Sequence, residues 1–325
     1  YFDRSFTVAG ERELAAEQTV SLPLGREFPA PGYYRADCRI KTPQGESRFE
    51  RSLAVMTPSG PTPGRASGFL FGVHSHPHRW SMRDKRLEAK AAGLAGIKVL
   101  RADAHWRSIQ PDSPEQWNFG LFDETVNVYA EQNIEVAVLL GAPPGWAKKP
   151  GWTKLRPEFR GEVRPANAPY REYLRRLAER YRGRIRFYEQ FNEPDLAVFY
   201  NFSADDYVEL FNEGAAVIRK ADPDAVILTG GFATIRVVSS TNSPDYLEKA
   251  LAGTRGHFDV HAQHEHGSFK DYQQRIDGPF RALREKLGIA GGPWYSNETA
   301  VSAAGGREKN QAAELWRKLL FAWSR

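Results

Sequence analysis

The sequence predicts an α/β fold, a (β/α)8 TIM barrel that follows a smaller β-rich module resembling part of a β-sandwich. From residue 68 onward, short apolar stretches of strand length alternate with longer segments whose apolar residues recur at helical spacing. Each strand–helix–strand unit implies parallel strands joined by a right-handed crossover. The length of 325 residues suits one barrel of about 250 residues and a small additional module.

An open, doubly wound sheet is the alternative α/β architecture. That fold typically carries a glycine-rich phosphate-binding turn after its first strand. The chain has no such turn after its first expected strand, which favours the barrel.

Seven strand–helix units can be assigned along the barrel. Strands are expected at residues 69–73, 97–100, 135–140, 185–193, 225–229, 258–262 and 293–297. Helices are expected at residues 82–94, 123–132, 169–181, 204–220, 246–252, 273–287 and 308–322. A closed barrel has eight strands, so we expect the eighth to lie beyond the sequence shown.

The first part of the chain reads as a separate module. Residues 32–40 and 47–55 alternate in the manner of strands, with a turn at residues 43–46 between them. We therefore expect a β-rich accessory module over residues 1–56, a Pro/Gly linker over residues 57–67, and the barrel over residues 68–325. The chain begins at Tyr1 inside this β-rich segment, so we expect a processed or trimmed N-terminus.

Composition excludes several classes of protein. The net charge is +5, and the absence of a dense Lys/Arg run argues against a nucleic-acid partner. No stretch is long and apolar enough to predict a membrane span, and no signal peptide opens the sequence. Cys38 is the one cysteine of the chain, which excludes an internal disulfide framework and a cysteine-based zinc site.

Two glutamates stand at the expected ends of strands. Glu193 precedes Pro194, which disfavours helix in the residue before it, so we expect Glu193 to be extended at the end of the fourth strand. Glu298 ends the seventh strand. Carboxyl ends of barrel strands meet at one mouth, so both side chains should face one pocket. Two facing carboxylates are what the hydrolysis of a glycosidic bond requires, with their pKa values split by the environment.

At these positions the chain resembles a known group of enzymes. Residues 188–194, Tyr-Glu-Gln-Phe-Asn-Glu-Pro, resemble the fourth-strand signature of clan A glycoside hydrolases, and residues 294–298, Trp-Tyr-Ser-Asn-Glu, resemble their seventh-strand nucleophile segment. Family 39 and its relatives look most similar. The resemblance implies a retaining glycosidase that acts on a carbohydrate without a cofactor, and it favours a secreted or periplasmic location.

The resemblance also implies roles for individual residues. Glu193 would be the general acid/base, Glu298 the nucleophile, and Asn192 the partner of the sugar 2-hydroxyl. Arg101 matches the second-strand arginine that orients the nucleophile. His264 matches the sixth-strand histidine, and His266 stands where many members have tyrosine.

Further residues are expected to contact the sugar. Trp146 and Trp106 lie just after the third and second expected strands, where an indole ring can stack on a sugar face. His76, at the end of the first strand, is also expected to line the substrate site.

Two other functions remain open at this point. His74 and His76 form a His-x-His pair that resembles the metal-binding pair of barrel amidohydrolases. That scheme expects a histidine on the fifth strand, where residues 226–231 have none, and it gives Glu298 no role. A barrel that only binds glycan would have lost a glutamate, and both are present.

The segment after the third strand is rich in basic residues. It contains Lys148, Lys149, Lys154, Arg156, Arg160 and Arg164 against two glutamates. A positive rim on the catalytic face would raise the local concentration of an anionic glycan. The alternative is a solvated loop whose charges have no recognition role.

Overall fold

The computed structural model of the chain describes residues 32–55, 70–233, 235 and 237–325. The chain divides into two compact units, Tyr1–Thr62 and Pro63–Arg325. Within the described residues, no helix is both long enough and apolar enough to cross a membrane.

The first unit contains an antiparallel hairpin. Strand β1 (Gly32–Thr42) pairs with β2 (Gly45–Val55), from Gly32 opposite Val55 to Thr42 opposite Gly45. Pro43 and Gln44 make the two-residue turn between them, as the sequence predicts. Any further strand of a sandwich within residues 1–31 lies outside the described residues, so the sandwich stays a prediction.

The second unit is built on parallel strands that follow one another in sequence order. Five strands form one sheet in the order β3-β4-β5-β6-β7, and β8 pairs with β9. Two isolated parallel bridges connect the region of β7 to the region of β8, namely Leu228–Val260 and Phe232–Gln263. The strands are β3 Gly72–His74, β4 Val99–His105, β5 Glu135–Gly141, β6 Ile185–Gln190, β7 Val226–Leu228, β8 His261–His264 and β9 Trp294–Glu298. The described part of this unit thus has seven parallel strands; the eighth stays an expectation.

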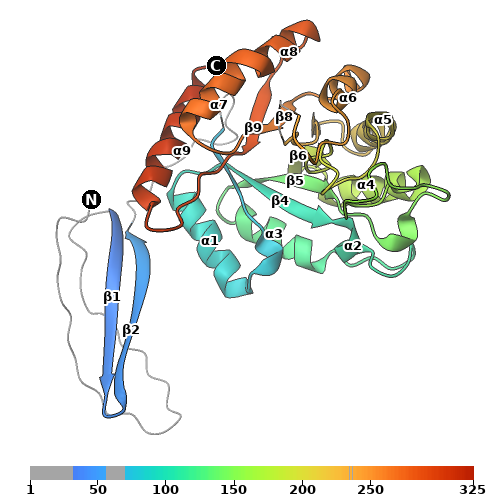
Figure 1. Cartoon of the computed structure of the whole chain (residues 1–325). Coiled ribbons are helices and arrows are strands. Elements are labelled where there is room, and N and C mark those ends of the chain that lie inside the picture. Colours follow the sequence, from blue (N-terminus) through green and yellow to red (C-terminus); the bar gives the residue numbers. More distant parts are fainter. Residues whose placement is uncertain (1–31, 56–69, 234, 236) are drawn as a thin grey trace. The chain divides into compact units, whose positions relative to one another are not determined.

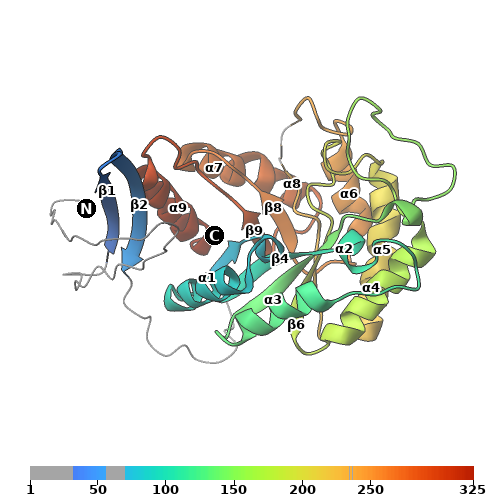
Figure 2. The same ribbon diagram turned by 90° about the horizontal axis from the view of Figure 1, so that it is seen from below.

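Helices lie on the outside of these strands (Figures 1 and 2). The longer ones are α1 Met82–Leu94, α3 Gly120–Ala130, α4 Asn167–Tyr181, α5 Ala204–Ala221, α6 Tyr246–Thr254, α7 Phe269–Arg275, α8 Arg281–Lys286 and α9 Glu308–Trp323. The short turns are η1 Pro77–Arg79, α2 Trp106–Ile109, η2 Gly145–Ala147 and η3 Ile276–Phe280. The predicted alternation of strand and helix is confirmed.

Serine side chains start three of the helices. Ser81, Ser203 and Ser268 each accept a hydrogen bond from a backbone N–H in the first turn of α1, α5 and α7. At α5 the side chain of Asp206 also accepts from the N–H of Ser203, which completes a capping box. These caps satisfy N–H groups that have no partner inside the helix.

One predicted helix is interrupted. The sequence predicts a single helix over residues 273–287, but the chain there forms α7, the π-helical turn η3 and then α8. Pro279 lies inside η3. Proline has no N–H for the bond to the preceding turn, so the α-helical ladder cannot continue through it.

Candidate active site

The chain turns sharply where β6 ends. Phe191 has φ of 70° and Glu193 has φ of 48°, both in the left-handed region that non-glycine residues rarely adopt. The prediction of an extended Glu193 is therefore wrong: regular pairing of β6 stops at Gln190. The N–H of Phe191 donates to Leu140 at 2.8 Å, and the N–H of Glu193 donates to Gly231 at 2.9 Å. These bonds, one to β5 and one to the segment that follows β7, hold the left-handed backbone.

Aromatic packing stabilises the same turn. The ring of Phe191 is fully buried, stacks on Tyr170 at 5.4 Å, and meets Tyr200 and Phe202 edge-on. Burying a ring of this size contributes about 2–3 kcal/mol, comparable to the strain of about 1–3 kcal/mol at each left-handed residue. The buried Phe191 thus helps to fix the direction in which Glu193 points.

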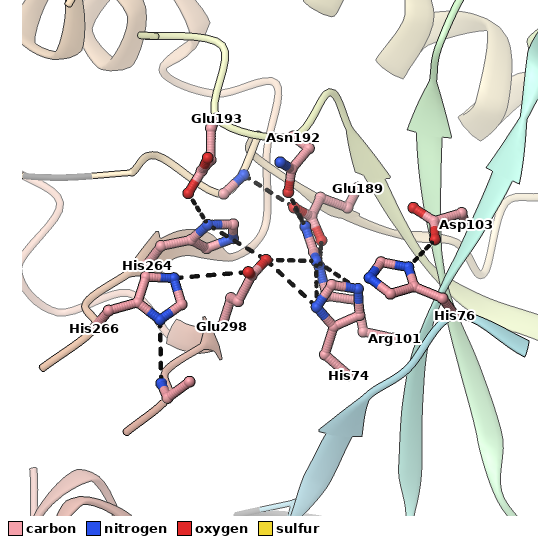
Figure 3. Close-up of polar contacts among 12 residues, drawn as sticks. His74, His76, Arg101, Asp103, Glu189, Asn192, Glu193, His264, His266 and Glu298 are labelled. Atoms are coloured by element: carbon pink, nitrogen blue, oxygen red, sulfur yellow. Dashed lines mark hydrogen bonds and ion pairs between the residues drawn. The ribbon is translucent and has the colours of Figure 1, made fainter. Parts of the chain in front are cut away.

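Arg101 on β4 connects the residues of the site (Figure 3). Its Nε and Nη2 donate to the two carboxylate oxygens of Glu189 at 2.7 and 2.9 Å. Nη2 also donates to Oδ1 of Asn192 at 2.8 Å, and Nη1 donates to Oε2 of Glu298 at 3.1 Å. The guanidinium is fully buried, so Glu189 is the counter-charge that allows it to remain there.

Glu189 is a site residue that the sequence reasoning missed. It is fully buried on β6, and besides binding Arg101 it accepts the N–H of Gly231 at 2.9 Å. The available signal was a carboxylate within a stretch of strand length, four residues before Glu193, because a carboxylate that becomes buried in a strand needs a charged partner.

Glu193 faces His264 across the site. Nδ1 of His264 lies 2.9 Å from Oε1 of Glu193, and the imidazole is fully buried. Burial is the main cause that raises the pKa of Glu193 to about 7, and the negative charge of Glu298 is the second cause. Burial is also the main cause that lowers the pKa of His264 to about 3, and the positive charge of Arg101 is the second cause. His264 is therefore neutral, and below pH 7 the protonated Glu193 can donate its O–H to Nδ1.

His264 was expected to contact the substrate. Its burial corrects that expectation, because the ring lies behind Glu193 with no exposed surface. Its contacts are with the carboxylates instead. Nδ1 lies 3.6 Å from Oε2 of Glu298, so one nitrogen bridges both glutamates and their oxygens lie at most about 6.5 Å apart.

Glu298 has the opposite electrostatic environment from Glu193. Burial alone would raise its pKa, but the contact with His74 and the charge of Arg101 outweigh burial and lower the pKa to about 2. Nδ1 of His74 lies 3.4 Å from Oε2, and Nε2 of His266 lies 3.6 Å from Oε1. Glu298 is therefore ionised at neutral pH while Glu193 shares the site as an acid of much higher pKa.

The hydrogen bond from Ala300 determines which tautomer His266 adopts. The N–H of Ala300 donates to Nδ1 of His266 at 3.2 Å, so in the neutral ring Nε2 carries the proton. That proton faces Glu298. The chain thus presents an imidazole N–H to Glu298 at this position.

His76 belongs to a group of imidazoles around a buried carboxylate. Its Nδ1 lies 2.6 Å from Oδ2 of Asp103, and the rings of His78 and His105 flank the same carboxylate at 3.6 and 3.3 Å. Burial opposes ionisation of Asp103, but the hydrogen bonds of His105 and His76 outweigh it and hold the pKa of Asp103 well below its usual range. His76 remains partly exposed, so a contact with substrate stays a prediction.

The two tryptophans differ in what they can do. Trp106 is fully buried, stacked on Tyr173 at 5.0 Å, and its N–H donates to Gln110. A role for Trp106 in stacking on sugar is therefore wrong. It begins the helix α2, and its ring is part of the hydrophobic core. Trp146 remains half-buried, with its N–H donating to the carbonyl of Gln110 at 3.0 Å, and its role stays a prediction.

Among the described residues, two groups of side chains have donor atoms close enough for a metal ion, but neither fits one. In the group His74, His76 and Asp103, the guanidinium of Arg101 lies 3.1 Å from His74, and this positive charge would repel a cation. In the group Glu193, His264 and His266, the bond from Ala300 places the proton of neutral His266 on the nitrogen that faces the site. A ligand histidine needs that nitrogen free of a proton. The amidohydrolase scheme thus gains no support from these contacts.

Half of the basic residues after β5 are used within the protein. Arg164 is fully buried between Asp206 and Glu209, and Lys154 donates to the carbonyl of Phe159 at 2.9 Å. Arg156 donates to Glu158 and to the carbonyl of Thr241, which fastens this loop to the one after β7. Lys148 and Arg160 are exposed and Lys149 is half-buried, and Nζ of Lys148 lies 5.6 Å from the centre of the Trp152 ring.

The fold defines the class of the protein as a TIM barrel of the clan A glycoside hydrolases. Residues 65–323 match the family model Cellulase (glycosyl hydrolase family 5). The chain therefore belongs to glycosyl hydrolase family 5. The predicted resemblance to clan A is confirmed, and no curated protein sequence matches the chain.

Solved structures support the same fold. A family 39 glycoside hydrolase from Bacteroides cellulosilyticus WH2 is 16% identical with a TM-score of 0.67, covering 90% of this chain and 61% of its own. A GH39 β-xylosidase from Caulobacter crescentus is 17% identical with a TM-score of 0.55, covering 78% and 61%. Xylanase 10B from Thermotoga petrophila RKU-1, in complex with xylobiose, is 16% identical with a TM-score of 0.57, covering 79% of each chain. The chain thus spans about three fifths of the first two structures.

Proposed function

We propose that the chain hydrolyses O-glycosidic bonds of an oligo- or polysaccharide with retention of anomeric configuration. Glu298 acts as the nucleophile and Glu193 as the general acid/base. The observation that carries this proposal is the split between the two carboxyl groups: a pKa of about 7 for Glu193 and about 2 for Glu298, in side chains bridged by one nitrogen of His264. One carboxyl group can thus hold a proton while the other is ionised.

In the first step, the ionised Glu298 attacks the anomeric carbon while Glu193 gives its proton to the departing glycosidic oxygen. The C–O bond to the leaving group breaks and an ester bond between the sugar and Glu298 forms. In the second step, Glu193, now a carboxylate, takes a proton from water, whose oxygen attacks the anomeric carbon. The ester breaks, Glu298 is released as a carboxylate, and Glu193 is again protonated.

The upper limit on the separation of the two carboxylates is compatible with double displacement. Retaining enzymes have carboxyl groups about 5–5.5 Å apart, whereas inverting enzymes need about 6.5–9.5 Å to admit a water. The two contacts of His264 limit the separation between Oε1 of Glu193 and Oε2 of Glu298 to about 6.5 Å at most, and the retaining range lies below that limit. Arg101 donates to both Asn192 and Glu298, and this shared contact supports the proposal that Asn192 meets the sugar 2-hydroxyl close to the attacking carboxylate.

The test uses a panel of 4-nitrophenyl glycosides and polysaccharides, beginning with β-xylosides, β-glucosides, xylan and cellulose. The structural neighbours named for xylosidase and xylanase activity and the cellulase family set this order. NMR of the first-formed sugar should show the anomer of the substrate. Hydrolysis that survives in both Glu193→Gln and Glu298→Gln, or a first product of inverted configuration, would contradict the proposal.

A further inference from the structure

Strand β9 carries one extra residue directly before Glu298. The pairing of β8 with β9 runs Gln263 opposite Ser296 and then His264 opposite Glu298, so Asn297 is the unmatched residue. A bulge of this kind bends its strand and redirects the side chains that follow it. Without it, the register would shift by one and Glu298 would face the other side of the sheet. The nucleophile candidate therefore depends on a local irregularity that something must hold in place.

Beyond the bulge, the segments that follow β8 and β9 remain hydrogen-bonded to each other. The N–H of Glu265 donates to the carbonyl of Glu298 at 3.2 Å, and the N–H of Gly267 donates to the carbonyl of Ala300 at 3.1 Å. These bonds connect the segment that carries His266 to the segment that follows Glu298. Their geometry decides how the imidazole and the carboxylate face each other.

The side chain of Lys318, on helix α9, contacts both segments. Its Nζ donates to Oγ1 of Thr299 at 2.9 Å and lies 3.5 Å from the carbonyl of Glu265. Thr299 in turn donates its hydroxyl proton to the same carbonyl of Glu265 at 2.6 Å. A hydroxyl has one proton to give, so Thr299 can accept from the lysine while it donates to Glu265. The result is a continuous series of hydrogen bonds from Lys318 on α9, through Thr299 just after β9, to Glu265 just after β8.

The mechanism does not use this lysine, and its position is unfavourable for a charge. The side chain is almost completely buried, beside the ring of Tyr272 at 5.4 Å. Burial lowers the pKa of Lys318 to about 8, although the nearby Glu314 and Glu265 favour the charged form. Arg275 pairs with Glu265 at 2.7 Å and adds positive charge nearby. A buried amine is costly unless it has specific partners, and Thr299 and Glu265 are those partners here.

We propose that Lys318 is a positioning residue for the reaction: it fixes Thr299 and Glu265, and so keeps the bulged Glu298 facing His264 and His266. The inference rests on the proposed function for its kinetic consequence, but its structural part stands by itself. Lys318 contacts neither Glu193 nor Glu298, and it takes part in no proton transfer of the proposed reaction.

The test compares matched variants. Thr299→Ser keeps the hydroxyl, Thr299→Val removes it at nearly the same volume, and Lys318→Met removes the ammonium but keeps the length of the side chain. Lys249→Met is the control, because Lys249 is exposed on the helix α6 and pairs with Asp245, the N-cap residue of that helix. Hydrogen–deuterium exchange reports on the amides of Glu265 and Gly267. Activity is measured per active site on the aryl glycoside that the unaltered chain hydrolyses fastest, with sites counted by an activated 2-deoxy-2-fluoro glycoside.

We expect Thr299→Val and Lys318→Met to speed exchange of the two amides about tenfold and to lower kcat per site by about 10- to 100-fold, with a smaller change in KM. The double variant should be no worse than either single one, because both break the same series of hydrogen bonds. Thr299→Ser and Lys249→Met should stay within about twofold of the unaltered chain. Unchanged amide exchange in Lys318→Met would overturn the inference whatever the activity. Additive losses of kcat in the double variant would also overturn it, and so would a loss of activity that a smaller number of active sites fully explains. An unaltered chain without glycosidase activity would instead defeat the proposed function, and the exchange result would still decide the positioning role of Lys318.

Discussion

Glu193 and Gly231 are joined by a backbone hydrogen bond of 2.9 Å, from the N–H of the glutamate to the carbonyl of the glycine in the segment after β7. Gly231 also donates its own N–H to Glu189 at 2.9 Å. One small residue therefore holds both the left-handed turn that presents Glu193 and the counter-charge of Arg101.

Replacing Gly231 should damage the site more than the fold. A Cβ there would overlap Nε2 of His264 and lie 2.9 Å from Oε1 of Glu189. We expect Gly231→Ala to destabilise the protein by about 1–3 kcal/mol, as overpacking usually does, and to lower kcat/KM by about 100-fold because His264 must move. Urea denaturation and steady-state kinetics measure the two effects. Gly291→Ala, where a Cβ meets nothing within 4 Å, is the control; equal behaviour of the two variants would contradict this account.

The pH dependence follows from the two carboxyl groups. Activity requires Glu298 ionised and Glu193 protonated, so kcat/KM should rise with pH through about 2 and fall with pH through about 7. The fall comes from loss of the Glu193 proton. In Glu193→Gln the fall near pH 7 should disappear from the residual activity on activated substrates. A rate that stays constant from pH 6 to pH 9 in the unaltered chain would show that Glu193 is not the acid.

Removing the acid should matter only when the leaving group needs a proton. Glu193→Ala should lower kcat/KM by about 10²–10⁴-fold on an alkyl or sugar leaving group. On a 2,4-dinitrophenyl glycoside the loss should be much smaller, because dinitrophenolate departs without protonation. Equal losses on both substrates would show that the acid/base assignment is wrong.

Removing the nucleophile should have a different signature. Glu298→Ala should lower kcat by at least about 10³-fold on every substrate, since the covalent intermediate cannot form. Added azide can occupy the vacated space and attack the anomeric carbon directly. The expected product is a glycosyl azide of inverted configuration, identified by NMR. Its formation in Glu193→Ala with the same configuration would exchange the two roles.

The charge of the loop after β5 gives a prediction about the substrate. Arg164, Arg156 and Lys154 bind within the protein, so any capture of an anionic glycan depends on Lys148, Lys149 and Arg160. Hydrolysis of a uronic-acid-bearing polysaccharide should fall as salt rises, because exposed attraction is screened over about 8 Å at physiological ionic strength. Hydrolysis of a small neutral aryl glycoside should not. The Lys148→Ala/Lys149→Ala variant should lose the difference, and an equal salt response of both substrates would leave the loop without a recognition role.

Much of the barrel could be predicted because periodicity is a local property. The helix α1 has the predicted bounds Met82–Leu94, and the buried face of α4 contains Tyr173, Leu174, Leu177 and Tyr181. The break at Pro279 was missed even though its physical cause is in the sequence, since the apolar spacing continues on both sides of it.

The candidate site could be predicted in part. The spacing of strands brings Glu193 and Glu298 to one end of the barrel, and that argument needs only their positions in the chain. The direction of Glu193, the burial of Trp106 and His264, and the role of Glu189 depend on contacts between distant residues such as Arg101 and Gly231. No local pattern contains those contacts, so sequence reasoning assigned exposed roles to side chains that the fold encloses.

The left-handed turn at Phe191 and Glu193 also bears on protein engineering. Because the turn depends on the packing of Phe191 and on backbone bonds to neighbouring segments, the seven-residue motif at 188–194 does not carry its own geometry. If the motif is transplanted alone into another barrel, we expect it to lose the left-handed turn and to aim its carboxylate elsewhere. A successful graft would have to move the surrounding aromatic shell together with the glutamate.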